Sequence, residues 1–380
     1  MPSWNRVEID LAALRHNYRQ VRGVVGSGVE ILAVVKSDAY GHGLLPAAHA
    51  FAQAGASAFG VAEVEEGLRL REAGVVGRIV VMLGVERHAA ADAVQHDLTP
   101  VVYDLASVEE LAFAAAKANR RIGLHLKVDV GMGRLGILPQ EIPAFCEGLS
   151  RFPNLYLAGV VSHFPKADME GDPAIEQQAA VFHEAMVRLA SLAQVSPIQH
   201  VANSAALLRS NAVHCDMVRP GISLYGCYPA EWLRRPETEL RPAMRMVSKV
   251  LQVKEVPAGF GVSYGHRFIT QRPTRLAVLP VGYHDGWLRR MIGQAEVLLG
   301  GKRVPVVGTI CMNACMADVT DLPAVSAGDE VVLLGRQGAE EITADQIAAW
   351  SGTISYEILC LLGSCNRQVH IDSDVDEGRQ

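Results

Sequence analysis

The stretch from Ile31 to Gly43, ILAVVKSDAYGHG, combines residue types and spacing that could do chemistry. It opens with five apolar residues, typical of a strand buried on both faces, and that run ends on Lys36. A lysine in a dry pocket gives up its proton readily and forms an imine with a carbonyl compound such as pyridoxal phosphate (PLP). Tyr40 adds a hydroxyl donor, and two glycines allow unusual backbone angles around His42. Taken alone, the stretch is better explained by a surface lysine before an ordinary glycine turn, because short motifs often match by chance.

The elements around this stretch alternate between apolar runs and amphipathic segments. Helical patterns occupy residues 44–54, 63–73, 107–119, 139–151 and 173–193. The alternation predicts an α/β fold with an N-terminal (β/α)8 TIM-like barrel of parallel strands. An open doubly wound sheet needs a glycine fingerprint after its first strand, and GHG does not match one. Eight β-rich runs are expected to form the barrel, and they end near Lys36, Ala62, Leu83, Asp104, Val130, Phe164, Asn203 and Gly226.

Polar residues follow the predicted strands where a barrel enzyme would use them. Barrel enzymes carry their chemistry at the carboxyl ends of the strands and often bind phosphate after the seventh and eighth. Any one of these residues is better explained as a solvated or structural group, but their joint placement predicts a site. The residues are Lys36 after the first strand, Arg134 after the fifth, His163 at the end of the sixth, Asn203 and Ser204 after the seventh, and Arg219, Gly221 and Ile222 in or after the eighth.

The chain changes character after the predicted barrel. Residues 225–241 are rich in proline and charge and are interpreted as a linker. Short β-rich runs then predict a mainly β domain, with late helices at residues 343–350 and around 354–361. The expected domains are residues 1–232 and 233–380, with the opening strand before Asp10 as a possible partner of the second domain. The charged residues 372–380 lack apolar periodicity and are expected to be disordered.

Composition narrows the class of protein. The chain has 380 residues, of which 49% are hydrophobic and 20% charged, and a net charge of −6. It has no apolar signal core at its start and no run near the ~18 apolar residues of a membrane span, so a cytoplasmic protein without membrane contact is expected. The negative charge argues against a nucleic-acid partner, and the arginines are expected to serve a small anionic ligand. None of the seven cysteines forms a CxxC pair, so reduced thiols and no metal site are expected.

The motifs together resemble those of the alanine racemases, bacterial PLP enzymes built from a barrel and a β domain that work as head-to-tail dimers. The resemblance covers nearly the whole chain and implies an isomerase that supplies D-alanine for peptidoglycan. The motifs are VEIDLAALRHN, AVVKSDAYGHG, HLKVDVGMGRLG, VVSHF, HVANSAA, RPGISLYG, GVSYG, VGYHDG and TICMNACMADVT.

The resemblance implies roles for the residues around the cofactor. Lys36 would be the lysine that binds PLP covalently, and Arg219 would face the pyridine nitrogen. Because an arginine keeps its proton, that nitrogen would stay unprotonated and the cofactor would be a weaker electron sink. The remaining implied cofactor contacts are His163 and Asn203, together with the phosphate donors Tyr40, Ser204, Tyr356 and the backbone of Gly221 and Ile222.

Two acid/base groups are implied, one for each face of the substrate. Lys36 would serve one face, and Tyr264, reaching in from the partner subunit of a homodimer, would serve the other. His163 and Arg219 match a hydrogen-bonded chain that could hold Tyr264 as the phenolate. Considered alone, Tyr264 is more simply explained by packing within the β domain.

The resemblance also implies a site for a small amino acid. Arg134 and the backbone of Met312 would bind its carboxylate, and Tyr283 together with Tyr356 would narrow the entrance so that alanine is favoured. Lys127 matches a lysine that is often carbamylated in the family, since an anionic group would brace Arg134 where an ammonium would repel it. The alternative is that Lys127 stays charged and pairs with Asp129.

Some positions depart from the family pattern. Asn313 stands where the family generally has Asp, Ser37 and Asp38 replace the usual Ala-Asn, and His284 replaces a small residue. Serine or a wider substrate range is therefore an open alternative to alanine. Two other classes share the barrel: PLP-dependent decarboxylases, whose His-Gly-Ser and Cys-Glu motifs are not found, and non-catalytic PLP carriers, which lack the β domain.

Overall fold

The computed structural model describes residues 4–193 and 196–373 and divides into two compact units. The first, here called the barrel unit, comprises Leu14–Ala39 and Leu44–Arg241. The second, the β unit, comprises Met1–Ala13, Tyr40–Gly43 and Pro242–Gln380. The opening residues and the short segment after Lys36 thus group with the C-terminal part of the chain.

The barrel unit is built on a sheet of eight parallel strands in the order β8-β7-β6-β5-β4-β3-β2-β9. Its two edges approach each other, because Asn203 and Arg219 form a parallel bridge and the N–H of Arg219 donates to the carbonyl of Ala202 at 2.8 Å. The predicted (β/α)8 barrel is therefore confirmed. The strands are β2 (Glu30–Val34), β3 (Ala58–Val61), β4 (Arg78–Val81), β5 (Leu98–Val102), β6 (Ile122–Lys127), β7 (Leu155–Val161), β8 (Ile198–His200) and β9 (Met217–Val218).

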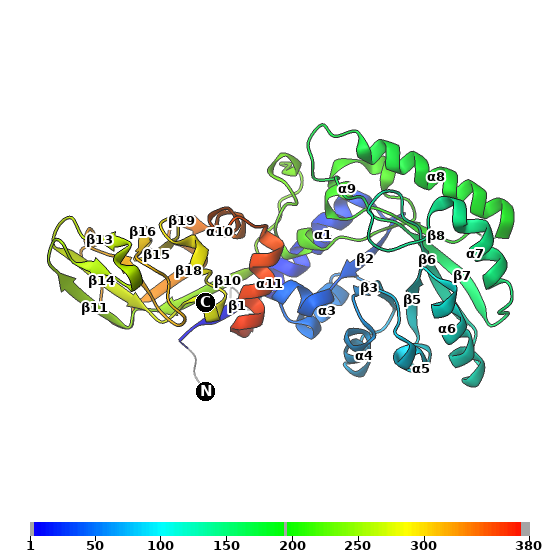
Figure 1. Ribbon diagram of the computed structural model, residues 1–380, viewed down its shortest axis with the longest axis horizontal. Coiled ribbons are helices and arrows are strands. Elements are labelled where there is room, and N and C mark those ends of the chain that lie inside the picture. The colour runs from blue at the N-terminus through cyan, green and yellow to red at the C-terminus, as the bar shows by residue number, and fades with distance from the viewer. Residues whose placement is uncertain (1–3, 194–195, 374–380) are drawn as a thin grey trace. The chain divides into compact units, whose positions relative to one another are not determined.

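Helices cover the outside of this sheet (Figure 1). Their starts follow local capping: Asp104 accepts the N–H of Ser107 at 2.7 Å and so begins its helix two residues before the predicted start at Ser107. Asp10 likewise accepts the N–H of Ala12 at 2.9 Å, in the first turn of its helix. The helices are α1 (Leu11–Val25), α3 (Leu44–Gln53), α4 (Val64–Glu72), α5 (Ala90–Gln95), α6 (Leu105–Lys117), α7 (Ile142–Leu149), α8 (Ala174–Ala193) and α9 (Ser204–Arg209).

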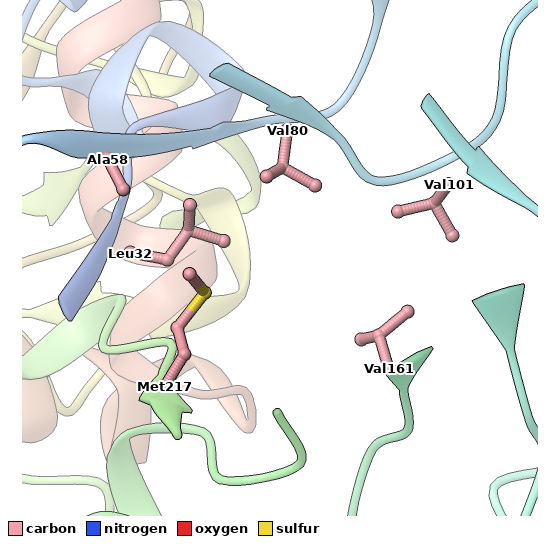
Figure 2. Close-up of a cluster of buried hydrophobic side chains, with 6 residues drawn as sticks. All are labelled: Leu32, Ala58, Val80, Val101, Val161 and Met217. Atoms are coloured by element: carbon pink, nitrogen blue, oxygen red, sulfur yellow. The ribbon is translucent and has the colours of Figure 1, made fainter. Parts of the chain in front are cut away.

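The interior of the barrel is filled by apolar side chains, each from a different strand. None of six clustered residues is more than 5% exposed, so the barrel encloses a packed core rather than a channel. Figure 2 shows this cluster, which consists of Leu32, Ala58, Val80, Val101, Val161 and Met217.

The β unit is built around a large mixed sheet in the order β11-β14-β17-β16-β15-β18-β10-β1-β20, with β19 paired to β18. The opening strand β1 (Arg6–Asp10) lies antiparallel to β10 and parallel to β20, which explains why the chain's first residues group with this unit. The other strands are β10 (Met244–Lys249), β11 (Gln252–Val256), β14 (Thr274–Leu279), β15 (Glu296–Leu299), β16 (Lys302–Val307), β17 (Cys315–Asp318), β18 (Glu330–Gln337), β19 (Glu340–Ile342) and β20 (Arg367–Ile371), besides the hairpin β12 (Gly261–Val262) and β13 (Phe268–Ile269).

Two late helices complete the β unit, α10 (Ala344–Ser351) and α11 (Ser355–Cys365). Thr343 caps α10 by accepting the N–H of Gln346 at 3.1 Å, close to the predicted start.

The seven cysteines of the chain are free thiols. Within residues 4–193 and 196–373, no helix is long and apolar enough to cross a membrane. The predicted disordered tail falls largely on residues 374–380, outside the described residues.

Gly363 of α11 makes a close backbone contact that generates a stability prediction. A Cβ at Gly363 would lie 1.9 Å from the carbonyl oxygen of Gly41, so Gly363→Ala must push the two backbones apart. We expect a loss of about 1–3 kcal/mol in unfolding free energy. Gly23→Ala in α1 is the control, because its Cβ meets nothing within 4 Å and should stabilise by roughly 0.5–1 kcal/mol. Equal urea midpoints for the two variants would contradict the packing argument.

Candidate active site

Lys36 begins a single turn, α2 (Lys36–Gly41), directly after the first barrel strand. The four residues that follow it, Ser37 to Tyr40, have φ between 51° and 56°, so the turn is left-handed. The sequence predicted unusual angles only at the glycines, whereas four residues with a Cβ also adopt them. Each costs roughly 1–2 kcal/mol, and such strain is typical of functional sites.

The carboxylate of Glu66 holds this turn in place. One oxygen accepts the N–H of Ser37 at 2.6 Å and the other accepts the N–H of Ala62 at 2.7 Å, which ties the ends of β2 and β3 together. Asp38 adds a bond by accepting the N–H of Leu44 at 2.8 Å. The backbone that carries Lys36 is therefore fixed by side chains of the barrel unit.

Arg219 is a buried cation whose donors are directed at backbone carbonyls. Its guanidinium donates to the carbonyls of His200 and Ser162, each at 2.6 Å, and of Val201 at 3.2 Å. It also lies 3.3 Å from Nδ1 of both His200 and His163. Burial lowers the pKa of Arg219 to about 10, which leaves it protonated at neutral pH.

His163 lies beside this cation and is neutral. Its Nδ1 faces the Arg219 guanidinium, and its Nε2 is 3.4 Å from Nδ2 of Asn203. Burial, followed by the positive charges of Arg219 and Lys127, lowers the pKa of His163 to about 2. The structure thus brings together the two residues that the sequence analysis joined in a hydrogen-bonded chain.

Lys127 ends β6 and is buried, with 7% of the residue exposed. Burial and the charges of Arg219 and Arg134 lower its pKa to about 7, against the opposing effect of Asp129. The Asp129 carboxylate is occupied by its own loop, where it accepts the N–H groups of Gly131, Met132 and Gly133 at 2.7–2.8 Å. No ion pair between Lys127 and a carboxylate is found in the part of the chain that the structure describes.

Arg134 sits on the loop that Asp129 stabilises. The loop returns to the barrel where the N–H of Ile137 donates to the carbonyl of Lys127 at 3.0 Å. The side chain of Arg134 is exposed and makes no hydrogen bond or ion pair within residues 4–193 and 196–373. Its guanidinium is therefore available to an anionic ligand.

Ser204 and Gly221 lie together after the last two barrel strands. The hydroxyl of Ser204 accepts the N–H of Gly221 at 2.9 Å and lies 3.1 Å from the hydroxyl of Ser223. Asn203 caps α9 by accepting the N–H of Ala206 at 3.0 Å, and Ile222 begins a short 3-10 turn. Hydroxyl and backbone donors are therefore concentrated where the sequence predicted a phosphate site.

Tyr40 and Tyr356 lie together within the β unit, with ring centroids 6.2 Å apart. Burial, and then the neighbouring Cys360, raise the pKa of Tyr40 above its ordinary value. Its hydroxyl therefore stays protonated and can donate a hydrogen bond.

Tyr264, Tyr283 and Met312 lie in the β unit, where residues 309–312 contact the segments that carry both tyrosines. The hydroxyl of Thr309 donates to the carbonyl of Tyr264 at 2.7 Å. The N–H of Tyr283 donates to the carbonyl of Cys311 at 3.1 Å, and the N–H of His284 donates to the carbonyl of Met312 at 3.0 Å. The three residues are 74%, 41% and 55% exposed, respectively. Tyr264 also lines a pocket of about 510 Å³.

Three residues that shape this site were not assigned roles from sequence: Glu66, His200 and His125. His200 contacts Arg219 directly, and its Nε2 lies 2.9 Å from Nδ1 of His125. The sequence feature that could have predicted this contact is the histidine within the apolar run GLHLKV, because a buried polar side chain needs a hydrogen-bond partner.

The charge and donors of this end of the barrel fit an anionic, covalently held cofactor. Lys36, Lys127, Arg134 and Arg219 all act electrostatically on His163. No carboxylate pairs with Arg134 or Arg219 among the described residues, so their positive charge is not cancelled. A PLP phosphate and a substrate carboxylate would supply the missing negative charge. The fold and site therefore define a PLP-dependent barrel enzyme with an accompanying β unit.

The chain belongs to the alanine racemase family. Residues 9–229 match the alanine racemase N-terminal domain, and residues 243–370 match the alanine racemase C-terminal domain.

Individual relatives match over almost the whole chain. The alanine racemase of Syntrophobacter fumaroxidans is 45% identical over 361 residues, which are 95% of each chain. The crystal structure of alanine racemase from D-cycloserine-producing Streptomyces lavendulae matches with a TM-score of 0.93 at 37% identity, over 98% of both chains. The alanine racemase of Bartonella henselae with covalently bound pyridoxal phosphate matches with a TM-score of 0.87 at 30% identity, over 97% of this chain and 100% of that one.

Glu66 provides a test of how the Lys36 turn is held. Glu66→Ala leaves the N–H groups of Ser37 and Ala62 without their acceptor, which we expect to cost about 1–3 kcal/mol in stability and to reduce bound PLP. Thermal unfolding and the ratio of PLP to protein after dialysis measure both effects. The exposed neighbour Glu65 gives the control variant Glu65→Ala. If both variants retain PLP and stability equally, Glu66 does not position the turn.

Proposed function

We propose that this protein is a cytoplasmic alanine racemase that interconverts L- and D-alanine with PLP and supplies D-alanine for peptidoglycan. The observation that carries the proposal is the fixed cation Arg219 at the same barrel end as Lys36, in a chain of the alanine racemase family. PLP, when bound, acidifies the Cα–H bond of the amino acid attached to it. The residues of this chain decide which reaction follows.

The proposed cofactor contacts follow from the donors described above. Lys36 would hold PLP covalently. Arg219, which keeps its proton, would face the pyridine nitrogen and leave it unprotonated, which would weaken electron withdrawal and favour return of the proton over transamination. The phosphate donors are Ser204, the backbone of Gly221 and Ile222, Tyr40 and Tyr356, while His163 and Asn203 flank Arg219.

Racemisation removes the Cα proton on one face and returns one on the other, so two groups must transfer protons. We assign these roles to Lys36 and Tyr264. The 74% exposure of the Tyr264 residue supports a role in the site of a second copy of the chain, and so a homodimer with shared active sites. Because Arg219 only donates, Nδ1 of His163 is an acceptor, and the neutral ring carries its proton on Nε2. His163 can therefore donate a hydrogen bond to the Tyr264 oxygen without adding a competing charge.

The proposed substrate contacts explain a preference for a small amino acid. Arg134 and the backbone N–H of Met312 bind the carboxylate, and Tyr283 with Tyr356 restricts the entrance. Asn313, in place of the usual Asp, reduces negative charge beside the Met312 loop. Serine is therefore the competitor to test against alanine.

A hydrogen-exchange experiment tests the reaction. The purified protein is incubated in D2O with L-alanine, L-serine and larger L-amino acids, and loss of the Cα proton is followed together with chirality. We expect L-alanine to exchange fastest and to become racemic. If no amino acid exchanges although PLP is retained, a PLP carrier or a decarboxylase replaces the racemase proposal.

Tyr264→Phe tests the second proton-transfer group. Removing the hydroxyl should lower kcat by roughly 10²- to 10⁴-fold while PLP content stays normal, because the ring and its backbone contacts are kept. Tyr156→Phe removes the hydroxyl of an exposed tyrosine in the barrel unit, far in sequence from Tyr264, and is the control that should keep wild-type turnover. Unchanged racemisation by Tyr264→Phe would remove Tyr264 from the mechanism.

We also propose that Lys127 is carbamylated and that the resulting anion braces Arg134. A carbamate forms from the neutral amine, and a pKa near 7 makes that form abundant at neutral pH. With 13C-labelled bicarbonate, NMR should show one carbamate signal in the wild type that is absent from Lys127→Met. The signal should fall as the pH drops below about 7, where Lys127 becomes protonated. A spectrum without this signal at pH 8 would leave Lys127 as a free amine.

A further inference from the structure

A second pocket lies at the amino ends of the barrel strands, opposite the candidate active site. It has a volume of about 650 Å³ and is lined by residues where four neighbouring strands begin, namely Arg78 of β4, Thr99 of β5, Gly123 of β6 and Tyr156 of β7. Lys127 and His163 lie at the carboxyl ends of β6 and β7. The pocket is therefore separate from the proposed PLP site, and its volume suits a small metabolite.

Positive charge predominates in the lining of this pocket. Arg71, Arg78 and Arg121 contribute cations, against the single lining carboxylate of Asp97. Arg121 is exposed, and its guanidinium lies over the ring of Tyr156 at 5.1 Å from the centroid. Two of the lining charges belong to ion pairs: Arg78 pairs with Glu30 at 2.8 Å, and Asp97 pairs with Arg120 at 2.9 Å. Arg71 donates to three backbone carbonyls at 2.9–3.0 Å.

His125 adds a polar atom with no partner to this lining. The residue is fully buried, yet it lines the pocket. Its Nδ1 is engaged by His200, whereas its Nε2 is buried without a hydrogen-bond partner among the described residues. A buried polar group without a hydrogen-bond partner costs about 1–3 kcal/mol of stability. A bound ligand that accepts a hydrogen bond from Nε2 would recover part of this cost.

The hydrogen bond from Arg219 to His200 determines which ring nitrogen of His125 carries the proton. An arginine only donates, so its contact with Nδ1 of His200 makes that nitrogen an acceptor. His200 then carries its proton on Nε2 and donates it to Nδ1 of His125 at 2.9 Å. Burial and the charges of Arg78 and Arg219 lower the pKa of His125 to about 3, so the ring is neutral. Its one proton is therefore on Nε2, so a residue that lines the pocket carries a buried N–H donor without an acceptor among the described residues.

We propose that this pocket binds a small anion, with its carboxylate or phosphate oxygens held by Arg121 and Arg78 and by the N–H of His125 at Nε2. The bound anion favours the tautomers in which both histidines carry their proton on Nε2 and keep Nδ1 as an acceptor. Its occupancy therefore strengthens the contact between His200 and Arg219 and links the two ends of the barrel.

Calorimetric titration of the PLP-loaded protein tests binding, with inorganic phosphate and succinate as separate probes. Arg134 in the proposed active site also attracts anions, so each titration is repeated with Arg134→Gln, and the heat that persists is assigned to the pocket. A response to succinate alone would identify a carboxylate site, and a response to phosphate alone a phosphate site. Failure of both probes to bind the Arg134→Gln protein would overturn the proposal.

Variants of the pocket residues distinguish specific binding of the anion in the pocket from its non-specific attraction to positive charge on the protein. Arg121→Gln should raise the Kd of the binding probe about tenfold, because one charge-assisted contact is lost. Arg188→Gln, on the exposed face of α8, removes an equal charge outside the pocket and should leave the Kd unchanged. Equal affinity in the two variants would refute the site.

A spectroscopic readout reports on His125 itself. In histidine labelled with 15N, the Nε2–H proton of His125 should shift downfield when the probe binds, and His125→Gln identifies that signal. The Arg121→Gln protein, whose buried core is unchanged, should require about tenfold more probe for the same shift. A signal that does not move at a probe concentration that saturates the calorimetric heat would exclude His125 as a ligand.

Discussion

The rest of the barrel site depends on how the guanidinium of Arg219 is kept out of water. A buried cation costs several kcal/mol unless its donors are satisfied. Here the acceptors are carbonyls of Ser162, His200 and Val201, which follow or end β7 and β8, whereas Arg219 follows β9. Only closure of the barrel between β8 and β9 brings these groups together. The closed sheet and the coordinated cation therefore support each other.

Because the acceptors of Arg219 are neutral, its charge remains effective at the neighbouring groups. It contributes to the lowered pKa of His163, of His200 and of Lys127. The two histidines consequently stay neutral, and Lys127 is poised to lose its proton near neutral pH. Burial is the larger cause of these lowered pKa values, and the permanent charge of Arg219 adds to it. This pattern suits a site for a phosphate and a carboxylate.

The left-handed turn after Lys36 is a second constraint. Its strained residues are retained because Glu66 accepts two backbone N–H groups at its start, and because Gly41 packs against α11 with no room for a side chain at either Gly41 or Gly363. The strain is thus offset by contacts on both sides of the turn. These contacts also explain why a flexible lysine can be presented from a fixed backbone at the barrel end.

The sequence by itself determined the barrel, the mainly β second part and the strand ends that carry Lys36, His163 and Asn203, because alternating apolar and amphipathic segments specify parallel strands whose ends share one edge. The family motifs added roles that rest on a second copy of the chain, such as that of Tyr264, and those roles stay predictions. Only the tertiary structure decided the left-handed turn, the support from Glu66 and the contact of His200 with His125, which are 75 positions apart. Residue type does not reveal a positive φ at a non-glycine position, and no periodicity tells which buried side chain a histidine will meet, because both depend on how distant segments pack.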